Sequence, residues 1–246
     1  MYLFSELQEK EKNGDRIRVC LIGAGKFGSM FLSQVTTTPG LEVARIADLD
    51  PARAKLTCKS VGWNDDQLGT VDFTDDALRA IQYGDFDVIV EATGHPPSGI
   101  KHAREAFKMG KHIIMVNVEA DVLAGPLLAK EAASAGVVYS MAYGDQPALT
   151  CELVDWARSC GFHVTAAGKG TKYLPQYHLS TPDTVWDHYG ISHEEAAEAG
   201  MTSKMFNSFL DGTKSALEMA AIVNACNLAP PNNGLKFPPC GMNDLA

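Results

Sequence analysis

The sequence predicts an α/β protein with a doubly wound parallel sheet, followed by a smaller α+β substrate or oligomerisation region. Three observations predict it. Short β-branched runs alternate with segments of helical spacing from residue 16 to about 142, a glycine-rich turn follows the first run, and the alternation stops near residue 142. Such alternation is typical of βαβ units, which place helices on both faces of a parallel sheet.

The expected strands are five apolar runs. They lie at residues 16–23, 41–48, 85–93, 111–118 and 135–142, and each is followed by a helical pattern. Together they predict a dinucleotide-binding domain over residues 16–145. The acidic, amphipathic segment 1–15 is expected to form an N-terminal helix that docks on the protein or contacts a subunit.

The second region is less regular. A loop leads into a helix over residues 143–162, FHVTAAG (162–168) is expected to be another strand, and helical patterns cover 192–200 and 203–226. We therefore assign residues 146–228 to a substrate and catalytic region. Residues 229–246 have the Pro- and Gly-rich composition of a linker, and we expect the chain to continue into a further C-terminal domain.

The composition of the chain limits the classes of protein to which it can belong. With 46% hydrophobic and 21% charged residues, the chain is expected to be globular, and no apolar run approaches the ~18 residues that a spanning helix needs. The N-terminus lacks the features of a signal peptide, and the six cysteines form no CxxC pair. A net charge of −9 argues against nucleic acid. We expect a cytoplasmic protein with reduced thiols and neither nucleic-acid nor membrane partners.

The glycine-rich turn indicates a cofactor site. LIGAGKFGSMF follows the first strand and opens a helix, with three glycines in the GxGxxG spacing. These glycines would permit a tight turn, approach of the backbone to a pyrophosphate, and close packing of the helix on the sheet, as in a Rossmann domain. The alternative is that they only turn the chain. The cofactor-binding candidates are Gly23, Gly25, Lys26, Phe27, Gly28, Asp48, Arg53, Thr93, Gly94 and Asn117.

Several of these candidates follow strands. Asp48 ends the second strand, where a carboxylate would meet the adenosine ribose and favour NAD, but Arg53 and Lys55 lie close enough to pair with the 2′-phosphate of NADP. Spacing leaves the preference between NAD and NADP open. Thr93, Gly94, Asn117 and Glu119 follow the next strands and are expected near the nicotinamide. For Glu119 the alternative is a carboxylate that stabilises a helix start.

A charged strip marks the second region. The stretch FLDGTKSALEMAAIV (209–223) predicts a helix that is apolar nearly all round except for Asp211, Lys214 and Glu218. Spacings of three and four residues place these charges on one side. The alternative is an ordinary surface pair of Lys214 with Glu218, worth ~0.3 kcal/mol.

The motifs in succession resemble a known superfamily. GAGKFG, ARIADLDPARA, IVEATG, VNVEADVLA, YGDQP and DGTKSALE are similar to motifs of the homoserine-dehydrogenase-like oxidoreductases, over residues 16 to about 228. In that family a TANK-type motif follows the fifth strand, and a D-G-x-D-x-x-x-K helix supplies acidic groups and a catalytic lysine. This chain departs there, with Glu119 and Ala120 in place of the Asn and Lys of the first motif. In the second motif it has Lys214 for the second Asp and Glu218 for the Lys.

The sequence resembles most a divergent branch of this superfamily, the 1-deoxy-D-xylulose 5-phosphate reductoisomerase-like enzymes. The stretches GKGTKYLPQYH and FNSFLDGTKSALEMA are similar to signatures of that branch. The resemblance implies NADPH-dependent conversion of a sugar phosphate to 2-C-methyl-D-erythritol 4-phosphate, by rearrangement and then hydride transfer. Lys214, Asp211, Glu218, Lys169 and Glu119 are then the catalytic candidates. Lys172, Thr171, Asn207 and Ser208 are the substrate-binding candidates. A surface loop around Lys169 and helix capping by Asn207 or Ser208 are the alternatives.

The remaining expectations concern metal, assembly and competing functions. A Mg²⁺ or Mn²⁺ ion held partly by substrate oxygens, with Glu119, Asp211 or Glu218, is compatible with hard-ion chemistry. His178, Asp183, Asp187, His188 and His193 crowd one segment without ligand spacing. The superfamily implies a homodimer or larger assembly. Two competing functions stay open: a dehydrogenase of a small hydroxy acid or an amino-acid alcohol, and a nucleotide-binding regulator without turnover.

Overall fold

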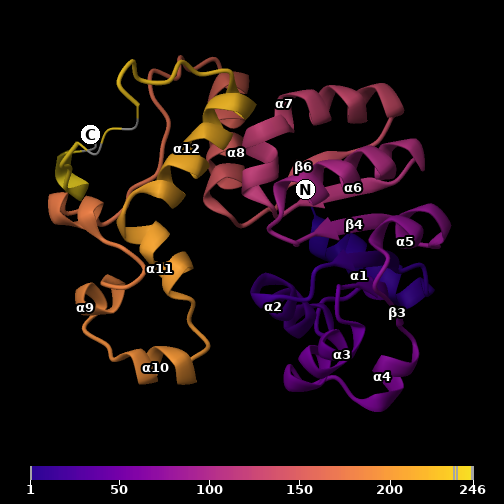
Figure 1. Cartoon of the computed structure of the whole chain (residues 1–246). Helices are drawn as coiled ribbons and strands as arrows, with labels where there is room; N and C mark the ends of the chain where they lie inside the picture. Colours follow the sequence, from indigo (N-terminus) through magenta and orange to yellow (C-terminus); the bar gives the residue numbers. More distant parts are fainter. Residues whose placement is uncertain (1, 235, 237, 245–246) are drawn as a thin grey trace. The chain divides into compact units, whose positions relative to one another are not determined.

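The computed structural model describes residues 2–234, 236 and 238–244, and the chain divides into two compact units, Met1–Tyr143 and Gly144–Ala246 (Figure 1). The expected linker at 229–246 includes Leu235, Phe237, Leu245 and Ala246, which lie outside the described residues. Among the residues described, no helix is both long enough and apolar enough to cross a membrane.

The first unit begins with α1 (Leu3–Asn13), which ends at Gly14. The helix is fixed at its C-terminal end because the carboxylate of Glu11 accepts a hydrogen bond from the backbone N–H of Gly40 at 3.0 Å and pairs with Arg16. The first turn of the helix leaves Tyr2, Leu3 and Phe4 exposed.

The first unit contains a six-stranded sheet in the order β3-β2-β1-β4-β5-β6, and all five neighbouring pairs are parallel. Its strands are β1 (Ile17–Ile22), β2 (Leu41–Ala47), β3 (Asp72–Thr74), β4 (Val88–Glu91), β5 (His112–Met115) and β6 (Tyr139–Met141). This order confirms the predicted doubly wound fold. The sequence prediction missed β3, because its three residues lack an apolar run.

Helices connect the strands of this sheet. They are α2 (Lys26–Val35), α3 (Pro51–Ser60), α4 (Asp65–Gly69), α5 (Ala77–Tyr83), α6 (Pro96–Lys108) and α7 (Val118–Ala135). Side-chain oxygens of Asp50, Asn64, Asp76 and Asn117 cap four of them by accepting backbone N–H groups. The polar residues just before these four helices thus satisfy donors that the first turn leaves unpaired.

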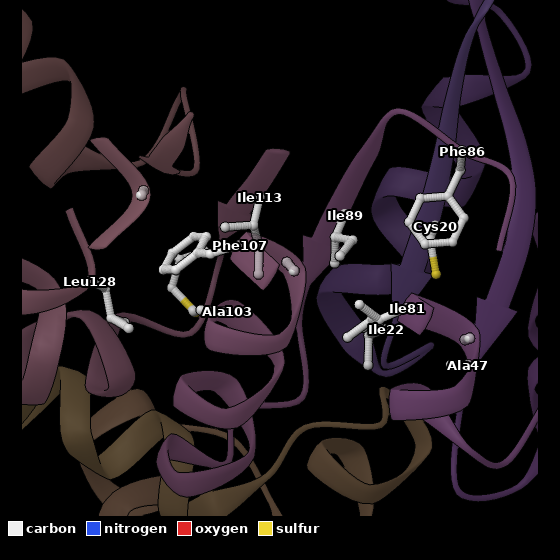
Figure 2. Packing of buried hydrophobic residues seen from close by; sticks show 14 of the residues in the cluster. Cys20, Ile22, Ala47, Ile81, Phe86, Ile89, Ala103, Phe107, Ile113 and Leu128 are labelled. Carbon is white, nitrogen blue, oxygen red and sulfur yellow. The ribbon is translucent and has the colours of Figure 1, made fainter. Parts of the chain in front are cut away.

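Each face of the sheet has its own apolar core, because successive residues of a strand point to opposite sides. Cys20 and Ile22 of β1 face one cluster, which Figure 2 shows with Ile89 and Phe107. Val19 and Leu21 of the same strand face the other cluster, with side chains from α2 and α3. The central strands β1 and β4 are buried on both sides over most of their length, as their continuous apolar runs predicted, whereas β3 and β6 are half-buried or exposed.

The second unit is helical within its described residues. It contains α8 (Gln146–Ser159), η1 (Pro175–Leu179), α9 (Val185–Tyr189), α10 (His193–Glu198), α11 (Ser203–Leu210), α12 (Thr213–Cys226) and η2 (Met242–Asp244). The expected strand at 162–168, and with it the α+β character of this region, is wrong for these residues, which form no regular structure. An extended segment becomes a strand only when another backbone pairs with it, and no described segment of this unit does so.

A second correction concerns the charged helix. The expected continuous helix over 203–226 is broken between α11 and α12. Gly212 stands at the break with φ +88°, a left-handed conformation that glycine adopts without the steric cost of a side chain. Asp211 therefore lies outside the helix that carries Lys214 and Glu218.

Candidate functional site

The glycine-rich turn between β1 and α2 has the geometry of a dinucleotide site. Gly23 has φ +96°, and a Cβ there would lie 2.8 Å from the carbonyl carbon of Ala92. A Cβ on Gly28 would lie 2.4 Å from the carbonyl oxygen of Gly23, whereas a Cβ on Gly25 would meet nothing within 4 Å. The first and third glycines are thus required by packing, and the second leaves open space at the start of α2. Lys26 and Phe27, in the first turn, are exposed.

Asp48 is held beside this turn by several donors. Its side chain is 4% exposed, and Oδ2 accepts from the N–H of Ala24 at 2.8 Å while Oδ1 accepts from the N–H of Asp50 at 3.0 Å. Arg53 Nη2 lies 2.7 and 2.9 Å from the two oxygens. Burial would raise the pKa of the Asp48 carboxyl, but these backbone and guanidinium donors outweigh it and lower the pKa.

A buried polar pair joins the last residue of β4 to α6, and sequence reasoning missed it. Glu91 is 0% exposed, and its Oε1 accepts from the Thr93 hydroxyl at 2.5 Å and lies 3.3 Å from Nδ1 of His102. His102 lies on α6 and is also buried. The signal was available, because a glutamate that ends an apolar strand and a histidine on the apolar face of the next helix are both expected to be buried. Thr93 and Gly94 are exposed at the same edge.

Asn117 and Glu119 occupy the start of α7. Asn117 is buried and caps the helix, since its Oδ1 accepts from the N–H of Ala120 at 3.2 Å. Glu119 lies half-buried in the first helical turn, where a carboxylate interacts favourably with the helix dipole. The structure thus places Asn117 at the carboxyl edge of the sheet in a capping geometry.

The second unit holds a buried carboxylate between two lysines. Glu218 of α12 is 3% exposed, pairs with Lys169, and its Oε1 lies 3.8 Å from Nζ of Lys214. The side chains of Lys169 and Lys214 are 17% and 25% exposed. Close packing supports this contact, because a Cβ on Gly168 would lie 3.2 Å from Sδ of Met219. Three catalytic candidates therefore form one cluster, which we call the lysine cluster.

The other candidates of this unit are engaged locally or exposed. Asn207 Nδ2 donates to Asp211 Oδ2 at 2.9 Å, and Asp211 Oδ1 accepts from the N–H of Thr213 at 2.8 Å, so Asp211 joins α11 to α12. The Ser208 hydroxyl donates to the carbonyl of Met205 at 2.6 Å. Thr171 and Lys172 are exposed on the loop that carries Lys169.

The histidine- and aspartate-rich segment forms no metal site within the part of the chain that the structure describes, since no three His, Cys, Asp or Glu side chains gather there as ligands. Instead, His178 and His188 stack edge-on against Tyr173 and Tyr177. His178 Nδ1 also lies 3.0 Å from the carbonyl oxygen of Asp211.

Two family models match the chain, one in each unit. Residues 17–119 match an oxidoreductase family with an NAD-binding Rossmann fold, GFO_IDH_MocA. Residues 144–246 match the catalytic domain of oxidoreductase DRL. No curated protein matches the sequence significantly.

Three solved structures are similar to parts of this chain, and one of them, a homoserine dehydrogenase, supports the fold. A homoserine dehydrogenase from Thiobacillus denitrificans is 15% identical with a TM-score of 0.57, covering 83% of this chain and 47% of its own. A scyllo-inositol dehydrogenase from Lactobacillus casei with bound NAD(H) is 16% identical, with a TM-score of 0.43 and coverage of 58% and 42%.

The WlbA dehydrogenase from Bordetella pertussis, in complex with NADH and UDP-GlcNAcA, is 20% identical with a TM-score of 0.46, covering 59% of this chain and 42% of its own. The chain thus spans less than half the length of these three proteins. By sequence, residues 17–119 are similar to the NAD-binding Rossmann domain of the GFO_IDH_MocA oxidoreductase family, and residues 144–246 are similar to the catalytic domain of oxidoreductase DRL.

Proposed function

We propose that the protein is an NADPH-dependent reductoisomerase that converts 1-deoxy-D-xylulose 5-phosphate to 2-C-methyl-D-erythritol 4-phosphate, a step towards isoprenoid precursors. One observation carries the proposal: the lysine cluster lies in the unit that matches an oxidoreductase catalytic domain. Burying the charge of a carboxylate costs free energy unless cations lie close to it. The lysine cluster therefore differs from an ordinary ion pair on an exposed surface.

The charge of the lysine cluster suits an anionic reaction. Lys169 and Lys214 share the single carboxylate of Glu218, so the cluster carries one net positive charge when all three groups are ionised. Rearrangement of the hydroxyketone and reduction of the resulting aldehyde both develop negative charge on a substrate oxygen. A partly exposed ammonium group stabilises such charge, and Glu218 keeps both ammonium groups in place.

The substrate phosphate needs separate recognition. Lys172 and Thr171 are exposed on the loop that carries Lys169, and they offer an ammonium and a hydroxyl. Gly170 in the same loop leaves open space around its backbone, since a Cβ there would meet nothing within 4 Å. We assign phosphate binding to this loop.

The Rossmann unit fits the cofactor. Open space at Gly25 and the N-terminus of α2 suit a pyrophosphate, and bound NADPH would supply the hydride for reduction. Arg53 is half exposed and neutralises Asp48, so the carboxylate repels a 2′-phosphate less than a free aspartate would. For this reason we propose NADPH as the preferred cofactor and NADH as the alternative.

A metal fits these residues poorly, and we assign no step to one. Both oxygens of Asp211 accept hydrogen bonds from protein groups, and Glu218 pairs with two lysines. A divalent ion would have to displace these contacts before either carboxylate became its ligand.

The test is oxidation of NADPH on addition of 1-deoxy-D-xylulose 5-phosphate, with and without Mn²⁺. Parallel assays use NADH, and aspartate semialdehyde as the homoserine dehydrogenase substrate. We expect oxidation with the sugar phosphate, reduced about 100-fold or more in Lys214→Ala, as for loss of one group that stabilises a transition-state anion. Lys204→Ala, on the exposed surface of α11, is the matched control and should retain activity.

Each other outcome contradicts the proposal in a different way. Oxidation with aspartate semialdehyde alone would identify a plain dehydrogenase. NADPH binding without oxidation by either substrate would favour a regulator. Equal activity in Lys214→Ala and Lys204→Ala would mean that the lysine cluster has no role in the reaction.

A further inference from the structure

The side chain of Glu91 holds the hydroxyl of Thr93 at the carboxyl end of β4. Glu91 is fully buried, and its Oε1 is 2.5 Å from Thr93 Oγ1, which donates to it. On its other side Oε1 lies 3.3 Å from Nδ1 of His102. The reaction scheme above leaves this buried carboxylate without a role.

Helix α6 also passes close to this carboxylate. A Cβ on Gly99 of α6 would lie 3.2 Å from Glu91 Oε2 and 3.0 Å from Asn117 Nδ2. Helix α6 therefore passes close to Glu91 only because residue 99 is glycine. The titratable groups near Glu91 are His102 on α6 and, through the Tyr139 hydroxyl, Asp121 on α7.

These contacts decide whether the Thr93 hydroxyl can donate a hydrogen bond to a ligand or only accept one, which we call its polarity. A hydroxyl has one proton and two acceptor lone pairs. The proton of Thr93 goes to Glu91, and the N–H of His95 donates to the Thr93 oxygen at 3.3 Å. Thr93 is exposed, and its remaining capacity is that of a hydrogen-bond acceptor.

Thr93 lies at the cofactor turn. A Cβ on Gly23, the first glycine of the motif, would lie 3.0 Å from the backbone N of Thr93. In this sheet order β4 starts the second mononucleotide-binding half, beside the switch point between β1 and β4. A dinucleotide bound beside this turn would therefore meet the Thr93 hydroxyl as a hydrogen-bond acceptor.

We infer that Thr93 accepts a hydrogen bond from the carboxamide NH₂ of a bound nicotinamide, and that Glu91, supported by His102, is the positioning residue that gives Thr93 this polarity. The inference rests on the proposed binding of a nicotinamide cofactor to the Rossmann unit. It needs neither the proposed substrate nor the lysine cluster.

The test compares binding of the reduced cofactor with binding of its 3-acetylpyridine analogue, in which a methyl group replaces the carboxamide NH₂. Isothermal titration of the full chain, without substrate, gives both affinities. We expect the natural cofactor to bind about 3- to 10-fold more tightly, the worth of one neutral hydrogen bond. Thr93→Val should abolish this discrimination and Thr93→Ser should retain it. Glu91→Gln should weaken it, because an amide NH₂ turned towards Thr93 would reverse the hydroxyl.

The outcomes separate this inference from the proposed function. Equal affinity for cofactor and analogue in the wild-type chain, or discrimination that persists in Thr93→Val, would overturn the inference while the reductoisomerase proposal stands. Failure of the wild-type chain to bind any nicotinamide cofactor would overturn both. Cofactor discrimination as expected, without turnover of the sugar phosphate, would support the inference and overturn the proposed function.

Discussion

The two units of the chain build their candidate sites from different materials. In the Rossmann unit the site is mostly backbone, a turn whose shape depends on Gly23 and Gly28 and whose open position is Gly25. In the second unit the site is made of side chains, with Glu218 between Lys169 and Lys214. The first depends on what side chains are absent, and the second on which charges are present.

The apolar cores of the two units differ in size. The Rossmann unit packs large apolar clusters on both faces of a sheet. Among its described residues, the second unit has two clusters with three buried members each, around Ile222 and Trp186. A unit with less apolar burial depends more on individual polar contacts, so single substitutions there should have separable effects on stability and charge.

The largest effect should come from the backbone-based site. Gly28→Ala would place a Cβ 2.4 Å from the carbonyl oxygen of Gly23, and separating α2 from β1 should cost about 3 kcal/mol of unfolding free energy, measured by urea titration with circular dichroism. Gly25→Ala is the matched control because its Cβ meets no atom within 4 Å. It should unfold like the wild type while binding NADPH more weakly. An unchanged urea midpoint for Gly28→Ala would contradict this account of the turn.

The side-chain-based site should respond less strongly. Glu218→Ala leaves Lys169 and Lys214 close together and partly buried, which should cost about 2 kcal/mol, less than a fully buried pair because both lysines reach water. The reference protein and its variants carry Trp63→Phe and Trp156→Phe, so that fluorescence comes from buried Trp186 alone and reports on the unfolding of this unit. Adding Lys169→Met should restore part of the loss. Glu198→Ala, on exposed α10, should change stability by less than about 0.5 kcal/mol, and an equal loss there would contradict a special role for Glu218.

The smallest effect concerns Asp48 and depends on pH. Because the donors around Asp48 lower its pKa in the folded protein, its stabilisation is present above the unfolded pKa of about 4 and is lost as pH falls through the lower folded pKa. Asp48→Asn should therefore cost about 1–2 kcal/mol at pH 7, and the difference from wild type should shrink below about pH 4. Asp75→Asn, on an exposed loop, should show no such pH dependence. If the difference in unfolding free energy between wild type and Asp48→Asn stayed constant below pH 4, the charge of Asp48 would not contribute to stability.

Sequence patterns predicted the first unit better than the second. Five of its strands and its fold class follow from apolar runs, because a buried parallel strand must be apolar on both faces. The sequence prediction missed β3 because its three residues, one exposed and two half-buried, carry no periodic signal. In the second unit, FHVTAAG has strand-like composition but finds no partner among the described residues, and a helix pattern over 203–226 gave no sign that Gly212 would be left-handed.

The sequence by itself determined the doubly wound sheet, the glycine turn and the grouping of Lys214 with Glu218, since each depends on residues within a few positions of one another. Only the tertiary structure decided that Glu218 is buried, that Lys169 reaches it from a distant loop, and that Glu91 meets His102 beneath Thr93. Lys169 and Glu218 lie far apart in the chain, and Glu91 and His102 lie on a strand and on the helix that follows it, so the packing of whole elements brings each pair together. The spacing of nearby residues does not predict which elements pack against each other.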